Sequence, residues 1–273
     1  MRDILRSPTG LIGTILLTLV FVASVFGPFI APYDPQMFHA ASRLQGPSAD
    51  FWLGTDQYGR DLMSRLLHGA PATVSFGLGA TALGVGAGSI IGVIAGVAGG
   101  RTDGVIMRIL DGMLAMPELL FTLLIVTFLG GGTTQAMLAV AVTFTPGMAR
   151  IARSAVLSVR TREYVLAAQA RGETQSWIVL REVLPNAIGP IIVEATIRVS
   201  FAIMIGATLG FLGLGAQPPS TEWGLMVAEA RQFMFRNPWC VVVPGLAIAI
   251  TAMGFNLFGD ALRDAFDPRK GHG

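Results

Sequence analysis

The sequence is short of charge, because only 13% of its 273 residues are Asp, Glu, Lys or Arg, against about 25% in a typical soluble domain. Apolar residues make up 52% of the chain, and its mean hydropathy is +0.63. A soluble protein of this length needs more charge to cover its surface. The composition therefore excludes an ordinary cytosolic enzyme. It fits a membrane protein with several spans, whose lipid-facing surface must be apolar.

Lysine, cysteine and histidine are also scarce. The one lysine, Lys270, lies outside any GxxxxGK[ST] phosphate-binding loop, so we expect no nucleotide motor of that type in this chain. The single Cys240 excludes an intrachain disulfide. The histidines are His39, His68 and His272. Because they lie far apart, we expect no metal site, and no clustered His, Cys or paired carboxylates indicate a membrane-embedded enzyme.

Long charge-free stretches indicate the membrane spans. They cover residues 7–33, 66–100, 119–149, 199–221 and 237–259, and one span needs about 20 apolar residues. As a single helix, 119–149 would be about 46 Å long, whereas the bilayer core is roughly 30 Å thick. Its middle, Gly130–Gln135, is rich in turn residues. We therefore split it, extending the halves to about Met113 and Ile151, which predicts six spans, the first an uncleaved anchor.

The distribution of basic residues predicts the orientation. With six spans and the N-terminus inside, 13 of the 19 Lys and Arg residues are cytoplasmic, as the positive-inside rule requires. A five-span arrangement with the N-terminus outside gives the same inside count, so the glycine-rich break and the helix length decide between them. Both termini are expected in the cytoplasm. The net charge is +2, and its arginines lie in short segments between apolar runs, so nothing indicates nucleic-acid binding.

Glycines repeat along the second predicted span. They occur at every fourth residue, at Gly84, Gly88, Gly92, Gly96 and Gly100, which places them on one helix face. In lipid, such a stripe lets another helix backbone approach closely. Plain helix packing and an interface that moves both remain open.

The first outer loop, residues 32–65, contains an apparent amphipathic helix over Thr55–Leu66. Within it, Asp56 precedes Arg60, and Asp61 precedes Arg65, by four residues, which is the favourable order for helical ion pairs. We expect an interfacial helix lying on the outer leaflet, with a specific docking role as the alternative.

Glu194 and Arg198 are the ionisable residues of the fifth span, which is expected to begin after Pro185. Ionisable residues inside a span indicate function by default. Since they lie four residues apart on one helix, they can also neutralise each other. A structural ion pair and a place on the transport path both remain open. A secondary transporter would need isolated carboxylates or broken helices, which this pair does not supply.

The longest cytoplasmic loop, Arg150–Pro185, has the most distinctive sequence. Residues 163–171 are rich in helix formers, and Gly172 lies where a helix ends in the left-handed conformation. A second helix then begins, with Thr174 or Ser176 as candidate N-caps, and Pro185 is expected to close it. The loop should be a helix, a sharp turn and a helix that project from the membrane.

This loop resembles the cytoplasmic loop of ATP-binding-cassette (ABC) importer permeases, which reads EAA, three residues, G, nine residues, I, one residue, LP. The residues that match in register are Ala167, Ala168, Gly172, Leu184 and Pro185, whereas Leu166 and Glu182 replace the Glu and Ile. Blocks at 53–65, 211–224 and 256–268 are similar to the C-type permeases of dipeptide, oligopeptide and nickel importers. That branch commonly has an acid near Gly206, and Glu194 and Arg198 are not typical of it.

The resemblance implies an all-α, type I ABC importer permease in a bacterial inner membrane. Its partners would be a second homologous permease, two ATPases that hold ATP and Mg²⁺, and an extracytoplasmic substrate-binding protein. The ATPase contact would involve Glu163, Tyr164, Ala167, Ala168, Arg171 and Gly172. The implied division is an anchor with outer loop (1–72), a permease domain (73–262) and a tail (263–273). Peptides are the expected substrate, with nickel, oligosaccharides or opine-like compounds as alternatives.

Overall fold

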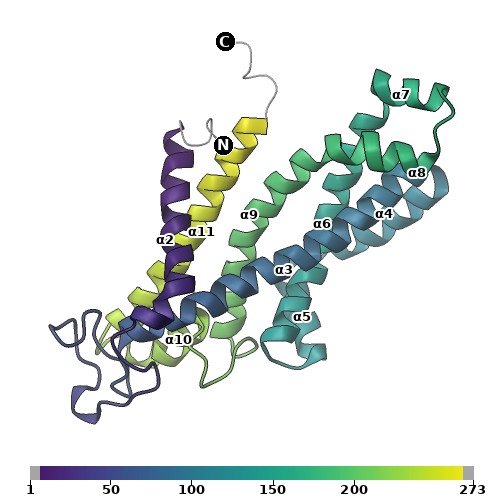
Figure 1. Cartoon of the computed structure of the whole chain (residues 1–273). Helices are drawn as coiled ribbons and strands as arrows, with labels where there is room; N and C mark the ends of the chain where they lie inside the picture. The colour runs from purple at the N-terminus through teal and green to yellow at the C-terminus, as the bar shows by residue number, and fades with distance from the viewer. Residues whose placement is uncertain (1–6, 267–273) are drawn as a thin grey trace.

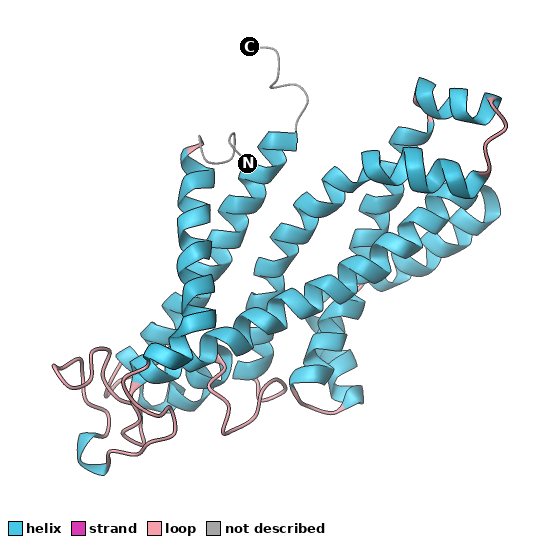
Figure 2. Ribbon diagram, viewed as in Figure 1, coloured by secondary structure: helices cyan, strands magenta, loops and turns pink. Residues whose placement is uncertain are grey.

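The computed structural model describes residues 7–266, and this part of the chain is helical without any β-strand (Figures 1 and 2). Four of the 13 basic residues predicted to be cytoplasmic, Arg2, Arg6, Arg269 and Lys270, lie outside the described residues. The main helices are α2 (Pro8–Ile30), α3 (Leu62–Ala98), α4 (Gly100–Leu114), α5 (Glu118–Leu129), α6 (Thr133–Arg160), α7 (Glu163–Ala170), α8 (Gln175–Ile178), α9 (Leu184–Phe211), α10 (Trp223–Ala230) and α11 (Trp239–Phe266). Short turns η1 (Ala40–Ser42), η2 (Val179–Val183) and η3 (Arg231–Phe233) complete the list.

Four helical segments are long and apolar enough to cross a bilayer, namely α2, α3, the continuous α8–α9 segment and α11. The pair α4 and α5 passes the same test together, although the two helices are bent by 91°. This confirms the all-helical membrane class. The predicted break at Gly130–Gly132 separates α5 from α6. The half before it is not one helix from about Met113, because the chain bends before Glu118 and α5 has 12 residues, about 18 Å.

The tightest helix contact joins α3 to α6 along the glycine stripe. A Cβ atom on Gly84, Gly88 or Gly92 would lie 2.3–2.8 Å from a backbone oxygen or side chain of α6. Gly96 similarly faces Val156. Gly100 was expected on the same face but lies beyond the end of α3, with φ +52° and nothing near its Cβ position. The stripe therefore has four members, and Gly100 is the first residue of α4.

Helices α2 and α11 form an antiparallel pair, which lies beside α9 (Figure 1). Gly13 of α2 packs on the backbone of Phe258, and Gly254 packs on Leu16 and Leu17. The beginning of α2 and the end of α11 therefore lie at one end of the molecule. Figure 1 shows α7 on this same side and the loop before α3 at the opposite end.

The outer loop contradicts the predicted amphipathic helix at Thr55–Leu66, since α3 begins only at Leu62. Residues 55–61 form a tight turn closed by a bridge between Thr55 and Asp61. Gly59 has φ +78°, and a Cβ there would lie 2.1 Å from a backbone oxygen of His39. Apart from the exposed Tyr58, residues 55–61 are buried within the folded loop.

Candidate functional site

The segment after α6 forms a helical hairpin at the end of the molecule. Helix α7 ends before Gly172, which has φ +81°, and the Thr174 side chain accepts a hydrogen bond from the backbone of Trp177 at the start of α8. The predicted helix, turn and helix are therefore present. A small core holds them to the end of α6, and its buried residues are Ala155, Val156, Val159, Val165, Ala168, Ile178, Val183 and Ala187.

The residues expected to contact an ATPase divide between the surface and this core. Glu163, Tyr164, Ala167, Arg171 and Gly172 are exposed. Ala168 has no exposed surface, so the structure assigns its methyl group to the internal packing. The exposed residues extend from the first residue of α7 to the turn after it, and nothing lies within 4 Å of the Cβ position of Gly172. This surface is free to receive another protein.

Pro185 does not end the second helix as predicted. Residues 175–211 form one continuous helical segment, in which η2 is a π-helical turn directly before Pro185. Proline lacks an N–H group and its ring clashes in a regular helix, and the wider π turn accommodates this change. The helix hairpin is therefore joined to the span α9 without a loop.

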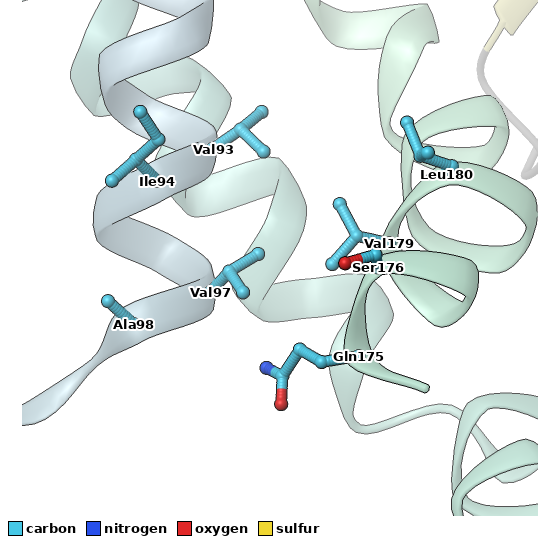
Figure 3. Close-up of a pocket in the computed structure, with 8 residues that line it drawn as sticks. All are labelled: Val93, Ile94, Val97, Ala98, Gln175, Ser176, Val179 and Leu180. Atoms are coloured by element: carbon cyan, nitrogen blue, oxygen red, sulfur yellow. The ribbon is translucent and has the colours of Figure 1, made fainter. Parts of the chain in front are cut away.

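An apolar groove borders the hairpin, as shown in Figure 3. Its walls are the end of α3 and the first turns of the α8–η2 segment, and it encloses about 650 Å³. The lining residues are Val93, Ile94, Val97, Ala98, Gln175, Ser176, Val179 and Leu180. This groove separates α3 from the beginning of the α8–η2 segment, so the hairpin is attached chiefly through its core on α6.

Arg198 connects three helices inside the membrane region. Its guanidinium lies 3.0 Å from Glu194 Oε1 on α9 and 3.0 Å from Glu118 Oε1 at the start of α5. It also lies 4.9 Å from the ring centre of Phe144 on α6, and Gly147 leaves space for it, since a Cβ there would approach Nη2 to 2.9 Å. The predicted Glu194–Arg198 pair exists, but it includes a second carboxylate that the sequence reasoning missed.

A second charged network lies at the outer end. Asp56 pairs with both Arg60 and Arg65, and Glu229 of α10 pairs with the same two arginines. Arg65 therefore pairs with Asp56, whereas the expected partner Asp61 caps α3 through Ser64. Burial raises the pKa of the Glu229 carboxyl, and Arg60 offsets part of that shift. The network attaches the outer loop to α10, across 164 residues of sequence.

These features define a class of protein: a helical membrane protein with several spans, charged residues between its helices and a helical hairpin exposed at one end. The sequence profile described as "Binding-protein-dependent transport system inner membrane component" matches residues 88–272, and the chain belongs to this family. Residues 1–47 match the N-terminal membrane domain of oligopeptide transport permease C. The chain is therefore a transport permease, which confirms the predicted family.

Individual relatives align over nearly the whole chain. The probable D,D-dipeptide transport system permease DdpC of Escherichia coli is 42% identical over 97% of this chain and 89% of its own. The dipeptide transport system permease DppC of Alkalihalophilus pseudofirmus is 40% identical over 98% and 88%. A chain of the inward-facing MetNI methionine ABC transporter has a similar fold, with a TM-score of 0.62 at 20% identity, covering 76% of this chain and 98% of that one.

Proposed function

We propose that this chain is the membrane subunit of an ATP-driven importer of short peptides in a bacterial inner membrane. The observation that supports it best is the exposed hairpin around Gly172, on a chain 40–42% identical to dipeptide permeases over nearly its full length. A second permease would complete the path, and a binding protein would deliver peptide from outside. Two separate ATPase chains would hold ATP and Mg²⁺ and perform the hydrolysis, so this chain itself is not an enzyme.

Six crossings fit the helices best. Helix α6 completes the set formed by α2, α3, the bent α4–α5 pair, α8–α9 and α11. It has 28 residues, about 42 Å, and many of its residues are buried between other helices, so it needs fewer apolar residues than a lipid-facing span. Six crossings would place both termini on the same side of the membrane as the hairpin, in the cytoplasm. The proposed division remains 1–72, 73–262 and 263–273.

The continuous segment from α8 to α9 suggests how the ATPases drive the permease. Glu163, Tyr164, Ala167, Arg171 and Gly172 would form the contact surface. When the ATPases bind ATP and close, they would displace the hairpin, and the unbroken helix would transmit this displacement to α9. Such rigid-body shifts of packed helices change access between the two sides of a membrane protein. ATP acts only through its different affinity for the two states.

The charged pair and the glycine stripe have separate roles in this proposal. Glu194 and Arg198 would line the path, because they lie between spans with part of each side chain exposed. Gly84, Gly88, Gly92 and Gly96 would keep α3 and α6 together as one unit.

Two experiments test the proposal. In proteoliposomes, the complex that copurifies with the tagged chain should accumulate labelled dialanine with ATP inside and the binding protein outside. In a C240A background, Tyr164→Cys should react with an impermeant maleimide in inverted vesicles and stay unlabelled in intact spheroplasts. Absence of uptake would refute the peptide importer, and labelling from outside would refute the orientation.

A further inference from the structure

A cavity of about 480 Å³ lies between α6, α9 and α11, near the end of the molecule that carries the hairpin. Its walls are mostly apolar, and they include one acidic and one basic side chain, Glu194 and Arg263. Small-molecule sites commonly have volumes of about 300–1,000 Å³, apolar walls and a few polar groups that fix the ligand. The cavity therefore has the size and the lining of a binding site.

Glu194 of α9 and Arg263 of α11 line the same cavity from two helices that pack against each other. Gly259 of α11 packs on Ile197 of α9, and Phe266 packs on Gly189. Glu194 and Arg263 each lie between these two contacts on their own helices. They do not form an ion pair, and Arg263 makes none with any other described residue. The two side chains thus reach one cavity without forming an ion pair with each other.

The charge of Glu194 is only partly compensated. Its Oε1 atom binds Arg198, but Arg198 is shared with Glu118, so two carboxylates face one guanidinium. The guanidinium of Arg198 also lies against the Phe144 ring and beside Gly147, so it is held between the two carboxylates and these neighbours. The cluster of Glu118, Glu194 and Arg198 therefore carries one formal negative charge in excess. A positively charged ligand group is the natural complement.

We propose that this cavity is a site for the zwitterionic backbone of a short peptide on its way to the cytoplasm. The ammonium group binds Glu194, and the carboxylate binds Arg263. Arg198 and Glu118 are positioning residues, which orient Glu194 and keep its charge available. The assignment rests on the proposed function, and it adds that the permease itself recognises both peptide ends after the binding protein has released them.

Equilibrium binding to the copurified complex in phosphatidylcholine nanodiscs, without binding protein, tests this site. Labelled dialanine should bind, and N-acetyl-dialanine and dialanine amide should compete about tenfold more weakly or worse, as a loss of 1.4 kcal/mol gives. Glu194→Gln should weaken the binding of dialanine about tenfold, and the variant should bind dialanine and N-acetyl-dialanine with equal affinity. Arg263→Gln should bind dialanine and dialanine amide with equal affinity.

Asp260→Asn is the matched control, because it removes a carboxylate from α11 outside the cavity lining; it should bind like wild type. Glu118→Gln should weaken dialanine in the same direction as Glu194→Gln. The site is overturned if dialanine does not bind, if the acetylated peptide competes equally, or if Glu194→Gln keeps the discrimination. ATP-driven dialanine uptake by the wild-type complex tests the function separately, since uptake without charge-selective binding refutes the site alone.

Discussion

The glycine stripe makes a sharp prediction about how α3 and α6 are held together. A Cβ added at Gly92 would lie 2.3 Å from the backbone oxygen of Ala149 and 2.8 Å from the Cβ of Ala152. Neither atom is the end of a flexible side chain, so Gly92→Ala must push the two helices apart. Overpacking of this kind costs about 1–3 kcal/mol.

Gly86 on the same helix supplies the control, since nothing lies within 4 Å of its Cβ position. Alanine is favoured over glycine inside a helix by roughly 0.5–1 kcal/mol. Gly86→Ala should therefore gain stability, whereas Gly92→Ala should lose it despite the same propensity gain. The two variants should differ by about 2 kcal/mol.

The assay is thermal melting of the detergent-purified chain, followed by fluorescence size-exclusion of a C-terminal fusion. For chains of this size, 1 kcal/mol shifts Tm by about 2–4 °C, so Gly92→Ala should melt about 4–8 °C below Gly86→Ala. Equal melting temperatures would show that α3 and α6 can separate at no cost, and the close-packing argument would then fail. Lost transport in a Gly92→Ala protein that melts normally would instead indicate a moving interface.

Three further predictions concern the hairpin and the outer end. Gly172→Val places a β-branched residue at φ +81°, a conformation that costs L residues roughly 1–2 kcal/mol. The variant should insert normally into the membrane but lose substrate-stimulated ATP hydrolysis. Normal transport would contradict this prediction. Arg65→Gln leaves the buried Asp56 and the partly buried Glu229 with Arg60 alone and should destabilise the chain by about 3 kcal/mol, the lower end for a broken buried pair. The exposed Arg236→Gln should melt like wild type, and equal melting of the two variants would contradict the argument. Burial raises the pKa of the Glu222 carboxyl, so the folded chain should lose stability as the pH rises from the ordinary carboxyl range through this raised pKa. In melting scans from pH 5 to 8, Glu222→Gln should reduce the dependence of Tm on pH. An unchanged dependence would argue against the prediction.

The sequence predicted the features that depend on local composition. The break at Gly130–Gly132 and the turn at Gly172 were predictable, because positive φ angles strongly favour glycine. Gly130, Gly132 and Gly172 all have positive φ angles in the structure. The membrane class followed from hydropathy alone. These features involve neighbouring residues, so periodicity and turn chemistry are sufficient to find them.

The outer loop shows where such reasoning fails. An acidic residue four positions before a basic one favours a helix. In the structure, however, the Asp56 carboxylate accepts hydrogen bonds from the backbone N–H groups of Tyr58 and Arg60. Asp side chains compete with helix formation in this way. Two signals were present: Gly59 within the proposed helix, and Asp61 three residues before Ser64 as an N-cap. Nothing local could reveal Glu229, whose pairing depends on the tertiary fold.

Pro185 misled for a different reason. Proline usually ends a helix, but here the π-helical turn η2 accommodates Pro185, so the helix continues from the hairpin into α9. Glu118 was missed because it lies beside an apolar run, 80 residues from Arg198. Its significance depends on the bend between α4 and α5, which places it against α9.

The two charged networks differ in a way that bears on their roles. At the outer end, Asp56 and Glu229 balance Arg60 and Arg65, and each arginine pairs with both acids. Such a closed set needs no ligand and is expected to hold the loop in place. Around Arg198, two carboxylates share one guanidinium and remain partly exposed, with side-chain exposures of 27% for Glu194 and 43% for Glu118. An unbalanced charge beside an open cavity is stabilised when a cation arrives, which supports the proposal that Glu194 and Arg198 line the path.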